Sequence, residues 1–234
     1  MSTPNITRWI GIGLLGLALF GALIFFSSLN PQPDYNTHLE AWARYVTTNH
    51  YVLEHLFLSI LGQILAIFGV FALGAYLATS RSGGMGLVAM VITVLGSALL
   101  LVILGATTFA APEEGQAILA GMNIDELPSS FAATVQALTG LGYILLGFVG
   151  NILLGVAIWR SGTLPRWAGA LWAGAHVLLY VSQGYAATIG PASTPPTVLV
   201  GAALVAISGA WMAFSVLSRP SGAPVGAAAQ PRVR

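Results

Sequence analysis

Residues 147–185 read GFVGNILLGVAIWRSGTLPRWAGALWAGAHVLLYVSQGY, two long apolar runs joined by a short turn that carries Arg160 and Arg166. Each run is long enough to cross a hydrocarbon core of about 30 Å as a helix that rises about 1.5 Å per residue. Gly162 suits a helix end and Pro165 suits the start of the next helix, while Arg and Trp suit the membrane interface. The stretch predicts a transmembrane hairpin.

The rest of the chain has the same character. Of its 234 residues 6% are charged and 56% are hydrophobic, whereas about 25% of the residues of a soluble domain are charged. We therefore expect an all-α membrane protein in which residues 1–218 form one domain. Its six spans are expected at residues 9–27, 55–78, 85–108, 131–158, 168–189 and 197–217. Residues 219–234, rich in Pro, Gly and Ala, are expected to be a disordered cytoplasmic tail.

Two segments are polar enough to leave the bilayer. In residues 30–54, Thr37-His38-Leu39-Glu40 fits a capping box, and apolar residues follow at helical spacing. This predicts a short amphipathic helix on the membrane surface. Pro112 is expected to start a second short helix, which Gly121 would end.

The arginines divide unequally between the expected loops. Seven fall on one side of the membrane: Arg8, Arg81, Arg160, Arg166, Arg219, Arg232 and Arg234. Only Arg44 falls on the other side, together with all seven Asp and Glu residues. The positive-inside rule then predicts that both termini are cytoplasmic and that the surface helices are external.

Several classes of chemistry are excluded or disfavoured. The chain has no cysteine, which excludes disulfides, thiolate metal sites and thiol redox chemistry. No Asp, Glu, Lys or Arg lies at the centre of an expected span, where ion-coupled transporters and voltage sensors need a charge. No G-x-S-x-G turn, phosphate-binding glycine loop or basic nucleic-acid face is present. We expect no cofactor and no nucleic-acid partner.

His176 is the one ionisable side chain expected deep in the bilayer. It lies ten residues beyond Arg166, about 15 Å into the core. Asn151 falls at a matching depth on the other arm of the hairpin. One interpretation is a neutral pair whose members bond each other, or backbone carbonyls, between helices. The other is an imidazole, oriented by Asn151, that binds a ligand or carries a proton.

Four further polar residues fall in the outer half of the expected spans: Gln63, Tyr143, Gln183 and Tyr185. Together they predict a small polar pocket open to the external side, suited to a polar headgroup, a quinone or a small solute. The alternative is that they are packing contacts inside the bundle.

The hexapeptide HYVLEH at residues 50–55 is a weak metal candidate. His50 and Glu54 share a helix face at i, i+4, and His55 is adjacent. The spacing matches neither H-E-x-x-H nor H-x-x-E-H. The alternative is an interfacial helix end whose polar tips lie in water.

Small residues recur at helical spacing and would allow close approach of helices in lipid. They are Ala18 and Ala22; Gly147, Gly150 and Gly155; Ala170 and Gly174; and Ala202, Ala206 and Ala210. Such faces would serve either the internal bundle or the helix of a partner, including a second copy of the chain.

The turn Ser161-Gly162-Thr163-Leu164-Pro165-Arg166-Trp167-Ala168-Gly169 resembles one found in families of bacterial six-helix membrane proteins without an assigned activity. The resemblance covers nine residues and implies no functional residue.

We expect a protein of the bacterial cytoplasmic membrane, in contact with the lipid bilayer. Our first hypothesis is that the protein is a non-enzymatic accessory or structural subunit of a membrane complex. The alternatives are a binder or permease for an uncharged or lipid-like ligand, and a membrane enzyme or redox protein using His176.

Overall fold

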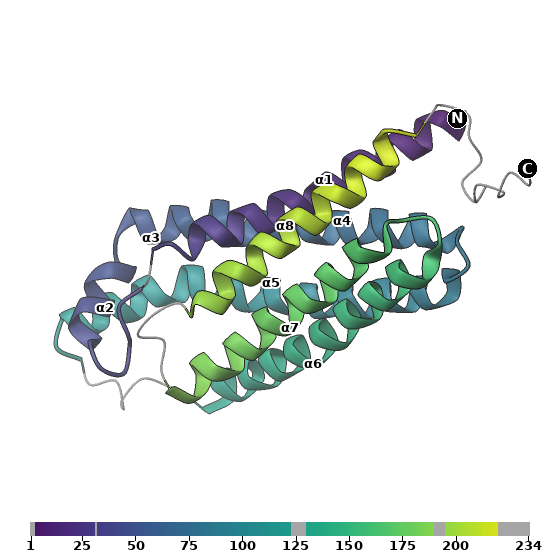
Figure 1. Ribbon diagram of the computed structural model, residues 1–234. Helices are drawn as coiled ribbons and strands as arrows, with labels where there is room; N and C mark the ends of the chain where they lie inside the picture. Colours follow the sequence, from purple (N-terminus) through teal and green to yellow (C-terminus); the bar gives the residue numbers. More distant parts are fainter. Residues whose placement is uncertain (1–2, 31, 123–129, 190–194, 220–234) are drawn as a thin grey trace, which may run out of the picture.

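The computed structural model describes residues 3–30, 32–122, 130–189 and 195–219, and side chains over 6–30, 32–122, 137–183 and 195–219. Within these ranges every regular element is a helix (Figure 1). In chain order they are α1 (Thr3–Ser27), α2 (Leu39–Val46), α3 (Asn49–Glu54), the π-helical η1 (His55–Ile60), α4 (Leu61–Ala78), α5 (Gly83–Leu119), α6 (Ser130–Ser161), α7 (Arg166–Ile189) and α8 (Pro196–Leu217). Residues 220–234 of the expected disordered tail lie outside the described residues.

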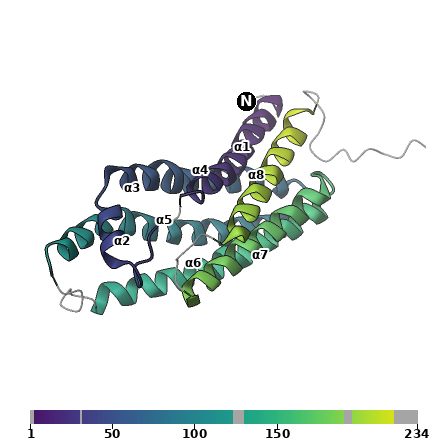
Figure 2. The same ribbon diagram turned by 60° about the vertical axis from the view of Figure 1, so that its left-hand side comes forward.

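The six long helices form a closed ring. Each of α1, α4, α5, α6 and α7 packs against the next long helix, and α8 packs against α1. Figures 1 and 2 show α1 and α8 side by side, with the start of α1 and the end of α8 at the same end of the bundle. Because the connections within the hairpins are short, neighbouring helices run antiparallel.

Among the described residues, five helical segments are long and apolar enough to cross a membrane: Ile6–Ser27, Asn49–Ala78, Gly83–Leu119, Ala137–Ser161 and Pro196–Leu217. Their outer faces carry large apolar side chains such as Phe68, Val102 and Phe214, which are 64%, 62% and 70% exposed. Such faces are stable against lipid tails and costly against water. The chain is therefore an all-helical protein embedded in a membrane, as its composition predicts.

The expected fifth span forms as α7 but is not among those five segments. The described part of α7 carries His176, Tyr180, Ser182 and Gln183, which lower its hydropathy. Of these, His176 and Ser182 are buried within the bundle. These two polar side chains therefore face neighbouring helices rather than lipid.

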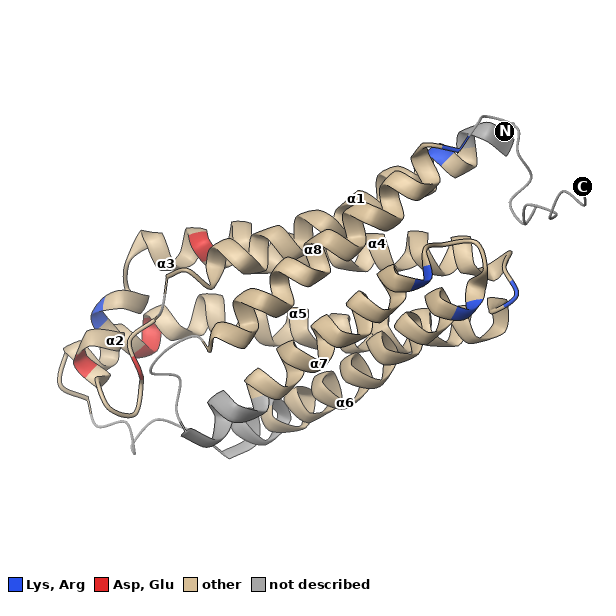
Figure 3. Cartoon of the chain, in the orientation of Figure 1, with Lys and Arg blue, Asp and Glu red and all other residues tan. Residues whose placement is uncertain are grey.

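Charged residues gather at the two ends of the bundle (Figure 3). Arginines mark the end where α4 meets α5 and α6 meets α7, which we call the basic end. Acidic residues mark the opposite end, beside α2 and α3, which we call the acidic end. The arginine at the acidic end, Arg44, pairs with Glu40 at 2.6 Å.

Two predictions about the acidic end are wrong. Pro112 starts no new helix, because α5 runs through it without interruption as far as Leu119. A proline at this position leaves the carbonyl of Thr108 without its usual amide donor. The neighbouring carbonyl of Thr107 accepts a hydrogen bond of 3.1 Å from the hydroxyl of Tyr51, so contacts from outside α5 support the backbone there. Gly121 does end this helix, with a positive φ of 84°.

The capping box is also absent. The N-cap of α2 is His38 rather than Thr37, and its side chain caps nothing. Thr37 instead donates to Asp34 at 2.8 Å, while Glu40 is held by Arg44. The local geometry of the preceding loop, stabilised by Asp34, competes successfully with the capping interaction.

The basic half of the bundle is filled by apolar side chains from all six long helices, including Leu14, Leu73, Leu154, Ala168 and Met212. Small residues bring the helices together around this core. A Cβ added at Gly21 would meet the backbone of Ala202 and Ala206 on α8, and one added at Gly155 would meet the backbone of Gly169 on α7. Most of the small-residue faces noted in the sequence therefore serve the internal bundle.

Candidate functional site: a polar cavity in the acidic half

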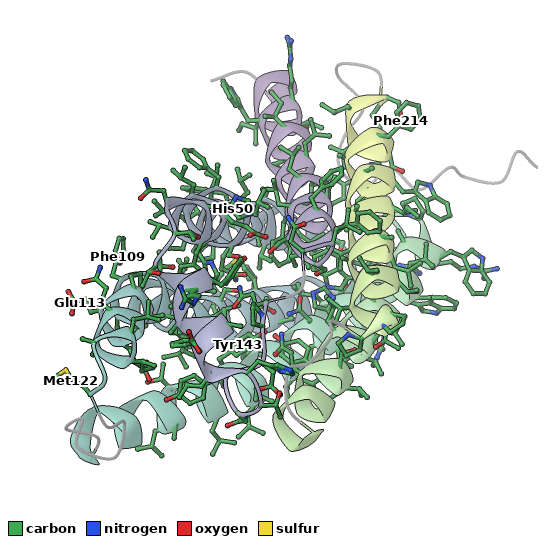
Figure 4. All side chains as sticks on the ribbon, turned by 90° about the vertical axis from the view of Figure 1, so that its left-hand side faces the viewer. His50, Phe109, Glu113, Met122, Tyr143 and Phe214 are labelled. Carbon is green, nitrogen blue, oxygen red and sulfur yellow. The ribbon has the colours of Figure 1, made fainter. Side chains whose placement is uncertain are left out.

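Toward the acidic end, the ring of helices encloses a cavity of about 250 Å³ to which every long helix contributes. Its polar wall consists mainly of Gln63, Thr93, Ser97, Tyr143, Asn151, His176, Tyr180 and Gln183. Its apolar wall includes Phe20, Ile24, Leu100, Leu104, Trp172 and Leu179. None of the described residues that line it is Asp, Glu, Lys or Arg. Figure 4, seen from the acidic end, shows Tyr143 among the helices, while Phe109, Met122 and Phe214 lie at the periphery.

His176 reaches this wall from α7 and is 4% exposed. Its Nδ1 lies 2.8 Å from the carbonyl oxygen of Trp172, one turn earlier on the same helix. Because a carbonyl only accepts hydrogen bonds, Nδ1 of the neutral ring carries the hydrogen, and Nε2 is left as an acceptor. The ring also rests on the indole of Trp172, with centroids 4.5 Å apart. These contacts fix both the orientation and the tautomer of the imidazole.

Asn151 reaches the wall from α6 and is 6% exposed. Its Nδ2 donates to the carbonyl of Gly147 at 2.9 Å, which fixes the amide so that Oδ1 is the free end. This Oδ1 is buried and has no hydrogen-bond partner. An unpaired buried acceptor costs about 1–3 kcal/mol.

The structure thus places Asn151 and His176 on one cavity wall, but they do not bond each other. Each bonds a carbonyl one turn earlier on its own helix. Backbone carbonyls bond both residues, as the first interpretation allows, but within one helix rather than between helices. It leaves Asn151 Oδ1 and His176 Nε2 unpaired within the described structure.

Three of the remaining polar candidates also meet at the cavity. Gln183 Nε2 donates to the hydroxyl of Tyr143 at 2.9 Å, linking α7 to α6 near the rim. Gln63 enters from α4 and is 4% exposed. Its amide has no hydrogen-bond partner among the described residues, yet it is not sealed from the cavity space. The side chain of the fourth candidate, Tyr185, lies outside the described residues.

Sequence reasoning missed Tyr180, which lies between the other polar groups. Its ring centroid is 5.6 Å from that of Tyr143 and 6.4 Å from that of His176. Gly147 makes room for it, since a Cβ at that position would collide with the Tyr180 hydroxyl. A signal was present in the sequence: Trp172, His176, Tyr180 and Gln183 follow one another at helical spacing and share one face of α7.

The wall from α5 is held close by glycines on α6. A Cβ on Gly150 would meet the backbone and hydroxyl of Thr93, and Gly96 on α5 approaches the backbone of Gly147 in the same way. These close approaches carry Thr93 and Ser97 to the cavity beside Asn151. Glycines noted for packing alone therefore also shape the site.

Near the rim the wall includes Leu58 and Ser59, which belong to the π-helical segment η1. A π-helical turn has i→i+5 hydrogen bonds and is found frequently at functional sites. Here it begins directly after Glu54 and ends where α4 begins. The irregular turn therefore sits where the helix passes from the acidic end to the cavity.

The metal candidates do not form a three-ligand site. His50 Nε2 lies 3.5 Å from Glu54 Oε2, but His55 Nδ1 bonds the backbone carbonyl of Tyr51 at 3.0 Å. Glu54 also accepts a hydrogen bond of 3.0 Å from Tyr45. Over the described residues no group of three His, Asp or Glu side chains could hold a metal ion. Glu54 is buried, so the alternative with every polar tip in water is also incorrect for this residue.

Outside the membrane spans, burial and the hydrogen bond to Glu54 raise the pKa of Tyr45 to about 12. This tyrosine stays protonated and donates to the carboxylate at physiological pH. The acidic end is therefore held together by defined hydrogen bonds, with Tyr35 also donating to Glu114 at 2.8 Å.

No protein-family model, curated protein or solved structure matches this chain. Its chemistry must be argued from the cavity itself. A wall that has no charged side chain among its described residues, and that combines unpaired polar groups with apolar side chains, is suited to bind a neutral amphipathic molecule.

Proposed function

We propose that the protein is a membrane binding protein whose cavity holds a small, uncharged, amphipathic molecule. One observation carries the proposal: Gln63 is 4% exposed and has no hydrogen-bond partner among the described residues, although its amide faces a cavity of about 250 Å³. A buried amide is costly to leave unpaired. A ligand in the cavity would complete the hydrogen bonding of this group.

The distribution of the wall residues supports an uncharged ligand. No carboxylate, lysine or arginine lines the described wall, so a charged ligand would lose its hydration without gaining a counter-charge. Side chains such as Phe20, Leu100 and Leu179 offer apolar surface for the carbon body of the molecule. Ligand sites of this composition use a few placed polar groups for orientation and apolar area for affinity.

The two ends of the cavity differ, which favours binding over an open channel. Toward the basic end the packed apolar core closes the ring. Beyond it, Arg219 donates to the Thr163 carbonyl, and its guanidinium lies 5.6 Å from the ring centroid of Tyr76. Toward the acidic end the wall reaches Ser28, just beyond α1, and the exposed Gln183. We infer that the ligand enters there.

This proposal is tested by identifying the small molecules that co-purify with the protein. Ser97 lines the cavity and is buried, so Ser97→Phe places a ring in the ligand space. Val102, on the same helix, is 62% exposed on the outer face, so Val102→Phe is the matched control. Mass spectrometry of protein purified in mild detergent should find a small molecule with the wild type and the control but not with Ser97→Phe. Equal content in all three would refute the cavity as the binding site.

For the membrane arrangement we propose six spans in the bacterial cytoplasmic membrane: the five apolar segments given above and, in addition, α7. The support is the ring, in which α7 lies between α6 and α8, and the gathering of arginines at one end (Figure 3). Both termini would then be cytoplasmic and α2 external. A reporter that is active only in the cytoplasm should be active when it is fused to the C-terminus. Activity of a reporter that works only outside the cytoplasm would overturn this orientation.

A second candidate function, an accessory subunit of a membrane complex or of a homo-oligomer, has one observation in its favour. A Cβ added at Gly174 on α7 would meet no described atom within 4 Å, unlike one added at glycines such as Gly155 that close internal contacts. An outward glycine next to Ala170 would admit a partner helix. Gly174→Leu should then abolish co-purification of the partner, and a lone monomer in several mild detergents would reject this candidate.

A further inference from the structure

We infer that the ligand carries a hydroxyl group that donates a hydrogen bond to Nε2 of His176, in the cavity that Gln63 also lines. This inference rests on the proposed function and narrows it to a neutral alcohol or phenol on an apolar body. Molecules that can only accept hydrogen bonds, such as ethers, esters and quinones, would be poor ligands.

His176 presents a hydrogen-bond acceptor to the cavity. Its Nδ1 is committed as a donor to the Trp172 carbonyl at 2.8 Å. No carboxylate lines the described cavity to stabilise an imidazolium, so the buried ring is neutral. A neutral imidazole with Nδ1–H offers only an acceptor at Nε2. Whatever meets this nitrogen must bring its own hydrogen.

This acceptor at Nε2 is accessible from the cavity. His176 is 4% exposed and its Nε2 has no partner among the described residues, but this atom is not sealed within the protein as Asn151 Oδ1 and Trp172 Nε1 are. Its remaining surface faces the cavity, whose wall His176 helps to form. A ligand can therefore reach Nε2 without displacing a protein hydrogen bond.

A hydroxyl group would complement this acceptor. Gln63, from α4, lines the same cavity, and its amide carries both a donor and an acceptor. A hydroxyl group both donates and accepts through one atom, so it can satisfy His176 Nε2 while its oxygen remains available to a donor in the wall. A carbonyl or ether oxygen could accept from Gln63 but would leave His176 Nε2 buried and unpaired.

The experiment compares 4-propylphenol with its methyl ether, 4-propylanisole, which has nearly the same shape but no donor. Binding to the full-length protein in detergent is measured by isothermal titration calorimetry. The phenol should bind the wild type at least about tenfold more tightly than the ether. In His176→Phe this ratio should fall to about one, and in His176→Gln, which keeps an acceptor, part of the preference should return. Equal binding of both probes to the wild type, or an undiminished preference in His176→Phe, would overturn the inference.

A second measurement avoids dependence on the folding of the variants. Nitrogen-15 NMR of the wild type reports the protonation of each imidazole nitrogen. Nε2 of His176 should be unprotonated, and 4-propylphenol but not 4-propylanisole should shift its resonance. A protonated Nε2 would contradict the inference directly.

The two proposals fail in distinguishable ways. If the wild type and Ser97→Phe hold the same small molecules and neither probe binds, the cavity is not a ligand site and both proposals fall. If a molecule is lost in Ser97→Phe but has no O–H group, the proposed function stands and only the hydroxyl inference falls.

Discussion

The basic half and the acidic half of the bundle are built from the same six helices but are filled differently. In the basic half, side chains such as Leu73, Leu154 and Met212 are fully buried against one another. In the acidic half, Gln63, Asn151 and His176 are also buried but line a cavity of about 250 Å³. The apolar pattern thus determines that a bundle forms. The placement of a few polar residues determines where its close-packed interior gives way to a cavity.

The largest difference between the halves should appear when leucine is truncated. Leu73→Ala removes a fully buried side chain and should lower the free energy of unfolding by about 2–5 kcal/mol. Leu100→Ala, at the cavity wall, should cost less than half as much, because its side chain already borders open space. Denaturant titration of both variants in one detergent measures this, and equal losses would break the comparison.

Glycines sharpen the comparison in a different way. Gly150→Ala places a Cβ against the backbone of Thr93 and should destabilise the protein by about 1–3 kcal/mol, since α5 and α6 must separate. Gly174→Ala adds a Cβ where no atom lies within 4 Å and should stabilise α7 by about 0.5–1 kcal/mol. Thermal unfolding of the two variants should therefore shift in opposite directions, and a shared direction would mean that the helix contacts are misplaced.

Replacing a polar residue of the cavity wall should weaken ligand binding and raise the free energy of unfolding. Gln63→Leu removes a buried amide that has no hydrogen-bond partner among the described residues and should raise the free energy of unfolding by about 1 kcal/mol. The same variant should retain less of the co-purifying molecule. Ser208→Ala is the control in the basic half, where Ser208 donates to the Ala168 carbonyl at 2.8 Å, and it should lower stability. A loss of stability in Gln63→Leu would show that the glutamine makes a structural hydrogen bond and is not part of a ligand site.

The smallest effect is expected outside the membrane. Tyr45 donates to Glu54 at 3.0 Å, and Tyr45→Phe should cost about 0.5–1 kcal/mol because the pair is partly exposed. The pKa of Tyr45 is raised from 10.0 to about 12, so its contribution is complete below pH 10 and is lost as the pH rises toward 12. Stability should fall over that interval in the wild type more than in Tyr45→Phe. Identical pH profiles would mean that the acidic end is not organised by this hydrogen bond.

Much of the scaffold could be predicted from the sequence because it depends on local periodicity. The apolar runs appear as helices, the turn before Pro165 joins α6 to α7, and Gly121 ends α5. The continuation of α5 through Pro112 could not be predicted, since it depends on contacts such as the Tyr51 bond to Thr107, 56 residues away in the chain.

The site was only partly visible for the same reason. Matching depth suggested that Asn151 and His176 would face each other, but depth does not specify hydrogen-bond partners, and both residues bond their own helices. The role of Tyr180 depends on the room left by Gly147 on another helix. The cavity itself is a sum of side-chain volumes across six helices, which no local pattern contains.

The most direct test of the central claim is a density map of the protein purified from its native membrane in mild detergent. We predict density of a small molecule inside the ring, in contact with His176 and Gln63 and bounded by Ser97. A cavity filled by rearranged side chains, or a bound molecule found only on the outer face of the helices, would contradict the account.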